Sequence, residues 1–129
     1  MRTNTKTGGW FLADIVECSE AVGVDKSNPN RRCLTWVNTL LIRAISLSDA
    51  YEKALAVAKK NYTLRYKAVS DRTIQWTVVG ISSIVPVYEE LKHGAEISWT
   101  DKGYLSAKRS SAMVISKRML LKAANEGGL

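Results

Sequence analysis

Hydrophobic and polar residues alternate in four segments of the chain, and this pattern is typical of strands with one buried face. The four predicted strands are residues 10–17, 33–45, 73–85 and 95–100. In the third segment the hydrophobic positions are even-numbered as far as Val78 and odd-numbered from Val79 onward. Such a slip beside Gly80 predicts a β-bulge or a close approach of another backbone.

Between the second and third strands, small and hydrophobic residues recur at helical spacing and predict an amphipathic helix over 46–62. Ser46 is placed to cap its first turn, with Asp49 three residues later. The hydrophobic side is wide enough to lie on a sheet. The following segment, 63–67, alternates in the manner of a strand but also fits a further helical turn.

Two further helical segments are predicted towards the C-terminus. Residues 88–93 fit one to two helical turns that Gly94 closes. Residues 106–124 predict a basic helix with Ala112, Ile115 and Met119 in one stripe.

The predicted fold class is α+β, with elements in β-β-α-β-β-α order. We expect a mostly antiparallel four-stranded sheet, the amphipathic helix packed on one face, and a basic C-terminal helix. One domain would span residues 10–124, between a flexible leader at 1–9 and a flexible tail at 125–129.

The first two strands are expected to form a hairpin. A loop centred near residues 25–26 places Cys18 opposite Cys33 and Phe11 opposite Leu40. A slip of one residue would exchange the two faces of the sheet. In this register the better core face collects Phe11, Ala13, Ile15, Leu34, Trp36, Leu40 and Ile42.

Four motifs occur in this order: W-F-L-A-D-I-V-E, S-L-S-D-A-Y-E-K-A-L, I-Q-W-T-V-V-G-I and V-Y-E-E-L-K-H-G-A-E-I. Together they resemble a family of small bacterial proteins catalogued as a domain of unknown function, DUF4288. The resemblance covers about residues 10–100 and leaves residues 101–129 outside it. It implies a compact α+β domain and brings no known catalytic residues.

The composition of the 129 residues, 46% hydrophobic and 24% charged, is that of a soluble globular protein. No hydrophobic run reaches the roughly 20 residues of a membrane span. The first residues lack the apolar segment of a signal peptide, so we expect a cytoplasmic protein in which Cys18 and Cys33 are reduced.

The sequence offers no catalytic, cofactor-binding or metal-binding constellation. His93 is the only imidazole, and it lies at an expected helix end rather than beside a nucleophile. Two cysteines and one histidine are fewer than the four ligands of a structural zinc site. Asp14 interrupts a hydrophobic strand and is expected to pair with Arg43 or to face a pocket.

Four tryptophans fall in predicted strands, and the net charge of +7 is concentrated in the C-terminal segment. We expect Trp36 and Trp76 in the core, whereas Trp10 and Trp99 are candidates for an exposed partner-binding surface. The remaining partner-binding candidates are basic: Lys108, Arg109, Lys117, Arg118 and Lys122.

The leading functional hypothesis is a small non-enzymatic binding domain that acts through protein–protein contact, as an inhibitor, immunity factor or adaptor does. We also expect the chain to self-associate as a homodimer, because pairing of two copies would cover the sheet face that the helix leaves exposed. The alternative is binding of nucleic acid or an anionic nucleotide through the basic C-terminal helix and exposed Trp residues. Docking of that helix on its own sheet, on a second copy or on anionic lipid also fits the pattern.

Overall fold

The computed structural model describes residues 8–62, 65–67 and 73–127. It contains two compact units, Met1–Ser98 and Trp99–Leu129, so the single domain predicted over 10–124 divides after Ser98. Most of the predicted leader, 1–9, and the end of the predicted tail, 125–129, lie outside the described residues.

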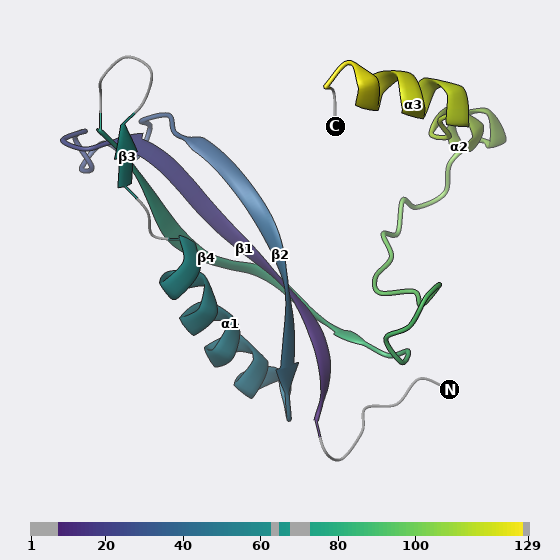
Figure 1. The fold of residues 1–129 in the computed structure, drawn as a ribbon, viewed down its shortest axis with the longest axis horizontal. Coiled ribbons are helices and arrows are strands. Elements are labelled where there is room, and N and C mark those ends of the chain that lie inside the picture. Colours follow the sequence, from purple (N-terminus) through teal and green to yellow (C-terminus); the bar gives the residue numbers. More distant parts are fainter. Residues whose placement is uncertain (1–7, 63–64, 68–72, 128–129) are drawn as a thin grey trace. The chain divides into compact units, whose positions relative to one another are not determined.

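The first unit is an antiparallel sheet with one helix (Figure 1). The strand order across the sheet is β2-β1-β4-β3. Three strands are long, and the fourth, β3, has only three residues and pairs with one end of β4. The elements are β1 (Gly9–Ala21), β2 (Leu34–Ala44), α1 (Leu47–Tyr62), β3 (Arg65–Lys67) and β4 (Thr73–Val87).

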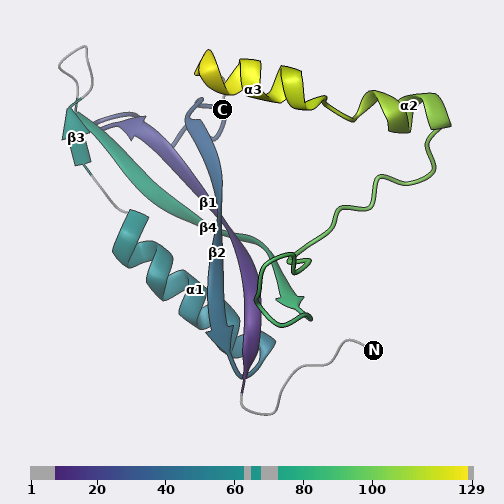
Figure 2. The same ribbon diagram turned by 45° about the vertical axis from the view of Figure 1, so that its right-hand side comes forward.

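The helix α1 crosses from one side of the sheet to the other. β2 and β4 are both antiparallel to β1 and therefore run parallel to each other. The chain passes from β2 to α1, which lies across one face of the sheet, and then through the short β3 to β4 (Figures 1 and 2). Three alanines of α1 are fully buried at this contact, Ala50, Ala54 and Ala58. The sheet contributes Phe11, Ala13, Ile15, Ile42 and Ala44 to the same core.

The first turn of α1 is capped as the sequence predicts. The backbone N–H of Asp49 donates a hydrogen bond to Ser46 Oγ at 3.1 Å. The Asp49 carboxylate accepts the backbone N–H of Ile45 at 3.0 Å and forms an ion pair with Lys53 at 3.1 Å. These contacts fix the point at which the chain leaves β2 and begins the helix.

The predicted fold class is wrong in its element order, although the α+β class with an antiparallel sheet is confirmed. Residues 95–100 form no strand, and 88–93 form turns and bends instead of a helix. None of the described strands pairs with residues 95–100, and an alternating pattern makes a strand only where a neighbouring strand shares its backbone hydrogen bonds. The undecided segment 63–67 contains β3 instead.

The predicted hairpin forms, but its register is wrong by two residues. Cys18 lies opposite Thr35 rather than Cys33, and Phe11 lies opposite Ile42 rather than Leu40. A shift of two residues leaves each side chain on its predicted face. The bulge predicted beside Gly80 is present at Val79, and a second one lies three residues further along β4, at Ser82.

The second unit contains two short helices, α2 (Ala107–Ala112) and α3 (Lys117–Asn125), where one helix over 106–124 was predicted. Each helix has its own N-cap. Ser106 Oγ accepts the backbone N–H of Arg109, and Ser116 Oγ accepts that of Met119, both at 3.2 Å. The second cap starts a new helix and so divides the predicted one.

Candidate functional site

The two edges of the sheet differ in how far they are protected. An unpaired edge strand presents a row of backbone N–H and C=O groups to any other extended chain. Along β4 this edge is interrupted: β3 covers residues 73–75, two bulges break the register with β1, and Pro86 supplies no N–H. Within the described residues, β4 is therefore the protected edge.

The other edge, β2, has none of these features. All of its eleven residues pair with β1 without a register shift. Its sequence, L-T-W-V-N-T-L-L-I-R-A, contains no proline and a single charged residue, Arg43, next to its end. We call Leu34–Ala44 the open β2 edge, because no described strand pairs with its outer side.

Large hydrophobic side chains are exposed on both faces of the open β2 edge. On the face opposite to α1, Val37 and Leu41 are 57% and 48% exposed. On the face that carries α1, Leu34 and Trp36 are 57% and 51% exposed. The helix covers only the later part of the strand, since Ile42 and Ala44 are buried in the core. The earlier part of β2 therefore presents apolar surface above and below an unpaired backbone edge.

A buried polar contact holds the middle of this strand in place. Asn38 Nδ2 donates a hydrogen bond of 2.6 Å to Oε1 of the buried Glu17 on β1. Beside it, the rings of Trp36 and Trp76 lie with centroids 4.7 Å apart at 45°. Burial of the carboxylate makes its hydrogen bond costly to lose, and the ring contact restricts Trp36. The exposed edge is thus held rigidly, which lowers the entropy lost on binding.

The opposite face carries a second pair of contacts. Thr39 Oγ1 donates a hydrogen bond of 2.7 Å to Asp14 Oδ1. The guanidinium of Arg43 lies over the Trp10 ring at 5.4 Å. The predicted pairing of Asp14 with Arg43 is therefore wrong. The Arg43 guanidinium contacts the ring of Trp10, and the Asp14 carboxylate accepts a hydrogen bond from the Thr39 hydroxyl.

Cys18 and Cys33 lie near the loop end of the β1–β2 hairpin, and both are free thiols. Their Sγ atoms lie 3.7 and 3.8 Å from Thr35 Oγ1 and share hydrogen bonds with it. Partial burial raises the pKa of the Cys18 thiol, and its contact with Cys33 raises it further. A raised pKa keeps the thiol protonated near neutral pH, so Cys18 is a poor nucleophile.

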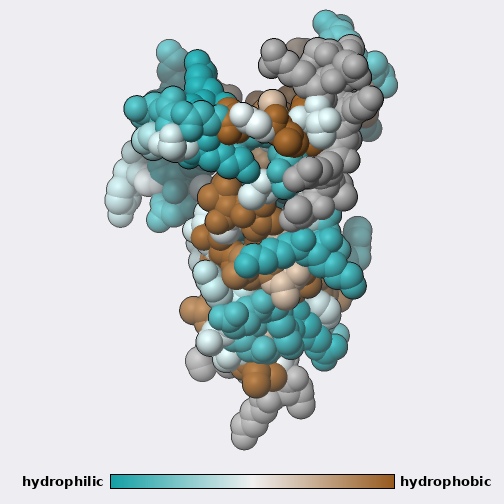
Figure 3. Space-filling model, turned by 90° about the vertical axis from the view of Figure 1, so that its left-hand side faces the viewer, coloured by the Kyte–Doolittle hydropathy of each residue, from teal (hydrophilic) through white to brown (hydrophobic). Residues whose placement is uncertain are grey.

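A pocket of about 470 Å³ lies between the first turns of α1 and the bulged part of β4. The residues described as lining it are Leu47, Ser48, Tyr51, Ile81, Ser82, Ser83 and Ile84, and none of them is charged. On the side of the molecule that carries α1, hydrophobic atoms gather between hydrophilic ones (Figure 3). This lining supplies hydroxyl groups and apolar contact but no acid–base pair.

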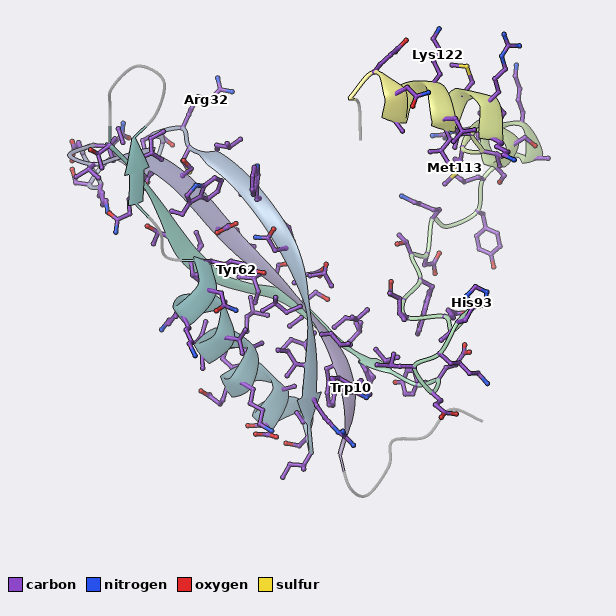
Figure 4. The ribbon with its side chains drawn as sticks, in the orientation of Figure 1. Trp10, Arg32, Tyr62, His93, Met113 and Lys122 are labelled. Atoms are coloured by element: carbon purple, nitrogen blue, oxygen red, sulfur yellow. The ribbon has the colours of Figure 1, made fainter. Side chains whose placement is uncertain are left out.

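The sequence-predicted site residues are divided between the two units. Trp10 is half-buried on β1 of the first unit. Trp99, 62% exposed, and the five basic candidates belong to the second unit. The structure therefore does not show them as one site. The basic side chains Lys108, Arg109, Lys117, Arg118 and Lys122 are all exposed on α2 and α3, where Lys122 projects outward (Figure 4).

Sequence reasoning missed the exposed residues of β2 and assigned Leu34 and Trp36 to the core. Trp76 is buried as predicted, whereas Trp36 is half exposed. One signal was present in the sequence: hydrophobic residues occupy both faces of β2, which a strand beside a single helix does not need.

Among the described residues, no three His, Cys, Asp or Glu side chains gather closely enough to hold a metal ion. His93 lies in the exposed segment after β4 (Figure 4). No helix in the described part of the chain is long and apolar enough to cross a membrane.

Comparison with known proteins identifies the first unit but no activity. No curated protein and no solved structure matches the chain. A family model, described as domain of unknown function (DUF4288), matches residues 10–99. The match contains all four strands and α1 and ends where the second unit begins. The chain therefore belongs to the DUF4288 family, with the helical segment after residue 99 lying outside the matched region.

Proposed function

We propose that this chain is a non-enzymatic protein-binding domain whose binding site is the open β2 edge, and that a second copy of the chain binds there. The observation that carries the proposal is the contrast between the two edges. The β4 edge is bulged, contains Pro86 and is partly covered by β3, whereas β2 is long, regular and hydrophobic on both faces. An edge of the second kind pairs readily with another strand.

Two copies can pair antiparallel about a twofold axis near Thr39, the middle residue of β2. In that register Leu41 lies opposite Val37 of the second copy, and Val37 opposite its Leu41. Each such cross-strand apolar pair contributes roughly 0.2–1 kcal/mol beyond the backbone hydrogen bonds. The interface uses the same surface on both copies, which is the usual arrangement in a dimer.

A protein partner with an exposed extended segment would use the same edge by strand addition. This mode of binding suits inhibitors, immunity factors and adaptors, which act by occupying a surface. Steady turnover of a substrate by the purified chain, abolished by a single substitution, would contradict a non-enzymatic role.

The oligomeric state tests the site directly. We expect the wild-type chain to dimerise with increasing concentration in sedimentation velocity experiments. The double variant V37K/L41K places lysines on the exposed face of β2, where their folding cost is small. It should weaken dimerisation by roughly tenfold or more, since two apolar pairs of roughly 0.2–1 kcal/mol each become pairs of facing like charges.

The matched control is V79K, which adds a lysine at an exposed valine on the protected β4 edge. It should leave dimerisation unchanged. A wild-type chain that stays monomeric at millimolar-scale concentration would remove the proposed interface, and so would equal weakening by V79K and V37K/L41K.

A further inference from the structure

The second unit carries a group of positively charged side chains with no acidic side chains among them. Residues 102–125 contain six Lys and Arg side chains and no Asp or Glu. No ion pair within this segment neutralises them, because it contains no carboxylate side chain. The cations are Lys102, Lys108, Arg109, Lys117, Arg118 and Lys122.

The same segment exposes large hydrophobic side chains in a short run. Between α2 and α3, Val114 is 78% exposed and Ile115 is 55% exposed. The full set is Met113, Val114, Ile115, Met119, Leu120 and Leu121. Exposed hydrophobic side chains are ordinary when scattered singly, but a contiguous group marks a surface that meets something apolar.

In α3 two of the three cations lie on the side of the helix opposite to Leu120. At about 100° per residue, Arg118 and Lys122 share one side, with Asn125 beside them. Leu120, Ala123 and Ala124 lie on the opposite side, and Lys117, the first residue of the helix, lies nearer to them. A helix divided in this way, with cations on its polar side, is typical of helices that lie in a membrane interface.

The turn between the helices adds to this surface. Met113 ends α2, and Ser116 caps α3, so Val114 and Ile115 lie in a turn between two helix ends. Met113 lies at this turn, and Lys122 extends from α3 (Figure 4). Exposure of these two β-branched hydrophobic side chains to water is unfavourable. In a turn at the surface they can enter the apolar layer beneath lipid headgroups.

We propose that residues 106–125 bind a membrane surface that contains anionic lipids. The Lys and Arg side chains contact the headgroup phosphates and carboxylates, and the apolar side chains around Ile115 and Leu120 insert below them. Charge complementarity favours an anionic surface. A nucleic acid would also attract the cations, but it would leave the six hydrophobic side chains in water. This inference is independent of the open β2 edge.

Vesicle co-sedimentation of the full chain tests the inference. The wild-type chain should bind vesicles of phosphatidylcholine mixed with phosphatidylserine and should not bind phosphatidylcholine alone. K117A/R118A should weaken binding about 30-fold, because each cation near an anionic surface contributes a factor of roughly five. I115S/L120S should weaken it by roughly tenfold or more while leaving the charge unchanged.

The charge-matched control is K59A/K60A, which removes two exposed cations from the last turn of α1. It should bind vesicles as the wild-type chain does. Equal weakening by K59A/K60A would show attraction by net charge alone and would overturn the proposal. Binding to both kinds of vesicle alike, or to neither at low salt, would overturn it as well. So would binding to a DNA or RNA oligonucleotide that exceeds vesicle binding and is unaffected by I115S/L120S.

Discussion

The distance between α1 and the sheet depends on the small size of three alanines. Ala50, Ala54 and Ala58 follow one another at intervals of four residues, and each is 0% exposed. They face the β1 side chains of the core, including Ile15, which is also fully buried. No larger side chain fits between helix and sheet unless the helix moves. Replacing the central alanine, Ala54→Leu, therefore tests how the fold is assembled.

The expected loss of stability follows from overpacking. Extra methylene groups in a well-packed core cost typically about 1–3 kcal/mol, and leucine adds three carbon atoms to alanine. We expect the free energy of unfolding to fall by about 3 kcal/mol. In a domain of about 100 residues, such a loss lowers the Tm by roughly 10–20 °C.

Ala56→Leu is the matched control, since Ala56 lies in the same helix but is exposed. Leucine and alanine differ little in helix propensity, so this variant should change the free energy of unfolding by less than about 0.5 kcal/mol. Urea unfolding followed by circular dichroism measures both variants. If A54L and A56L are equally stable, α1 does not lie on the sheet through Ala54, and the described core is wrong.

Two further predictions concern the pKa shifts in the first unit. The N–H of Ile45 and the cation of Lys53 lower the pKa of the Asp49 carboxyl group. The ionised Asp49 should therefore contribute fully to folding stability at a pH above the ordinary pKa of aspartate, and this contribution should be lost as the pH falls through the lowered pKa of the folded state. The stability difference between wild type and Asp49→Asn should shrink over that acidic range, and a difference that does not change with pH would contradict this. Burial raises the pKa of Cys18, so its alkylation by iodoacetamide should require a higher pH than that of free cysteine. Mass spectrometry locates the modified residue, and faster alkylation of Cys18 than of free cysteine at neutral pH would refute the shift.

Local patterns predict the elements that carry their own signals. The alternation in β1, β2 and β4, the cap at Ser46 and the bulge beside Gly80 depend on a few neighbouring residues, and all are present. The hairpin register fails because the connection between β1 and β2 is a long loop, 22–33, whose length does not set the pairing as a two-residue turn does.

Patterns that need a distant partner are less predictable. Residues 95–100 alternate as a strand does, yet Ile97 is exposed and the segment forms no strand. Likewise, the stripe of Ala112, Ile115 and Met119 would extend one helix if a surface held it. Without such a surface, the local cap at Ser116 decides where the chain turns.

The candidate site was beyond sequence reasoning because strand order decides which strand is an edge. β1 and β2 both carry hydrophobic residues on both faces, and either could be the central strand by that criterion. The structure places β1 in the centre, where α1, β2 and β4 use its hydrophobic residues. It leaves β2 at the edge with the composition of a central strand. The fold of a single chain does not explain why Val37 and Leu41 on this edge strand are hydrophobic. A further strand paired with β2 would explain it, because β2 would then be a central strand.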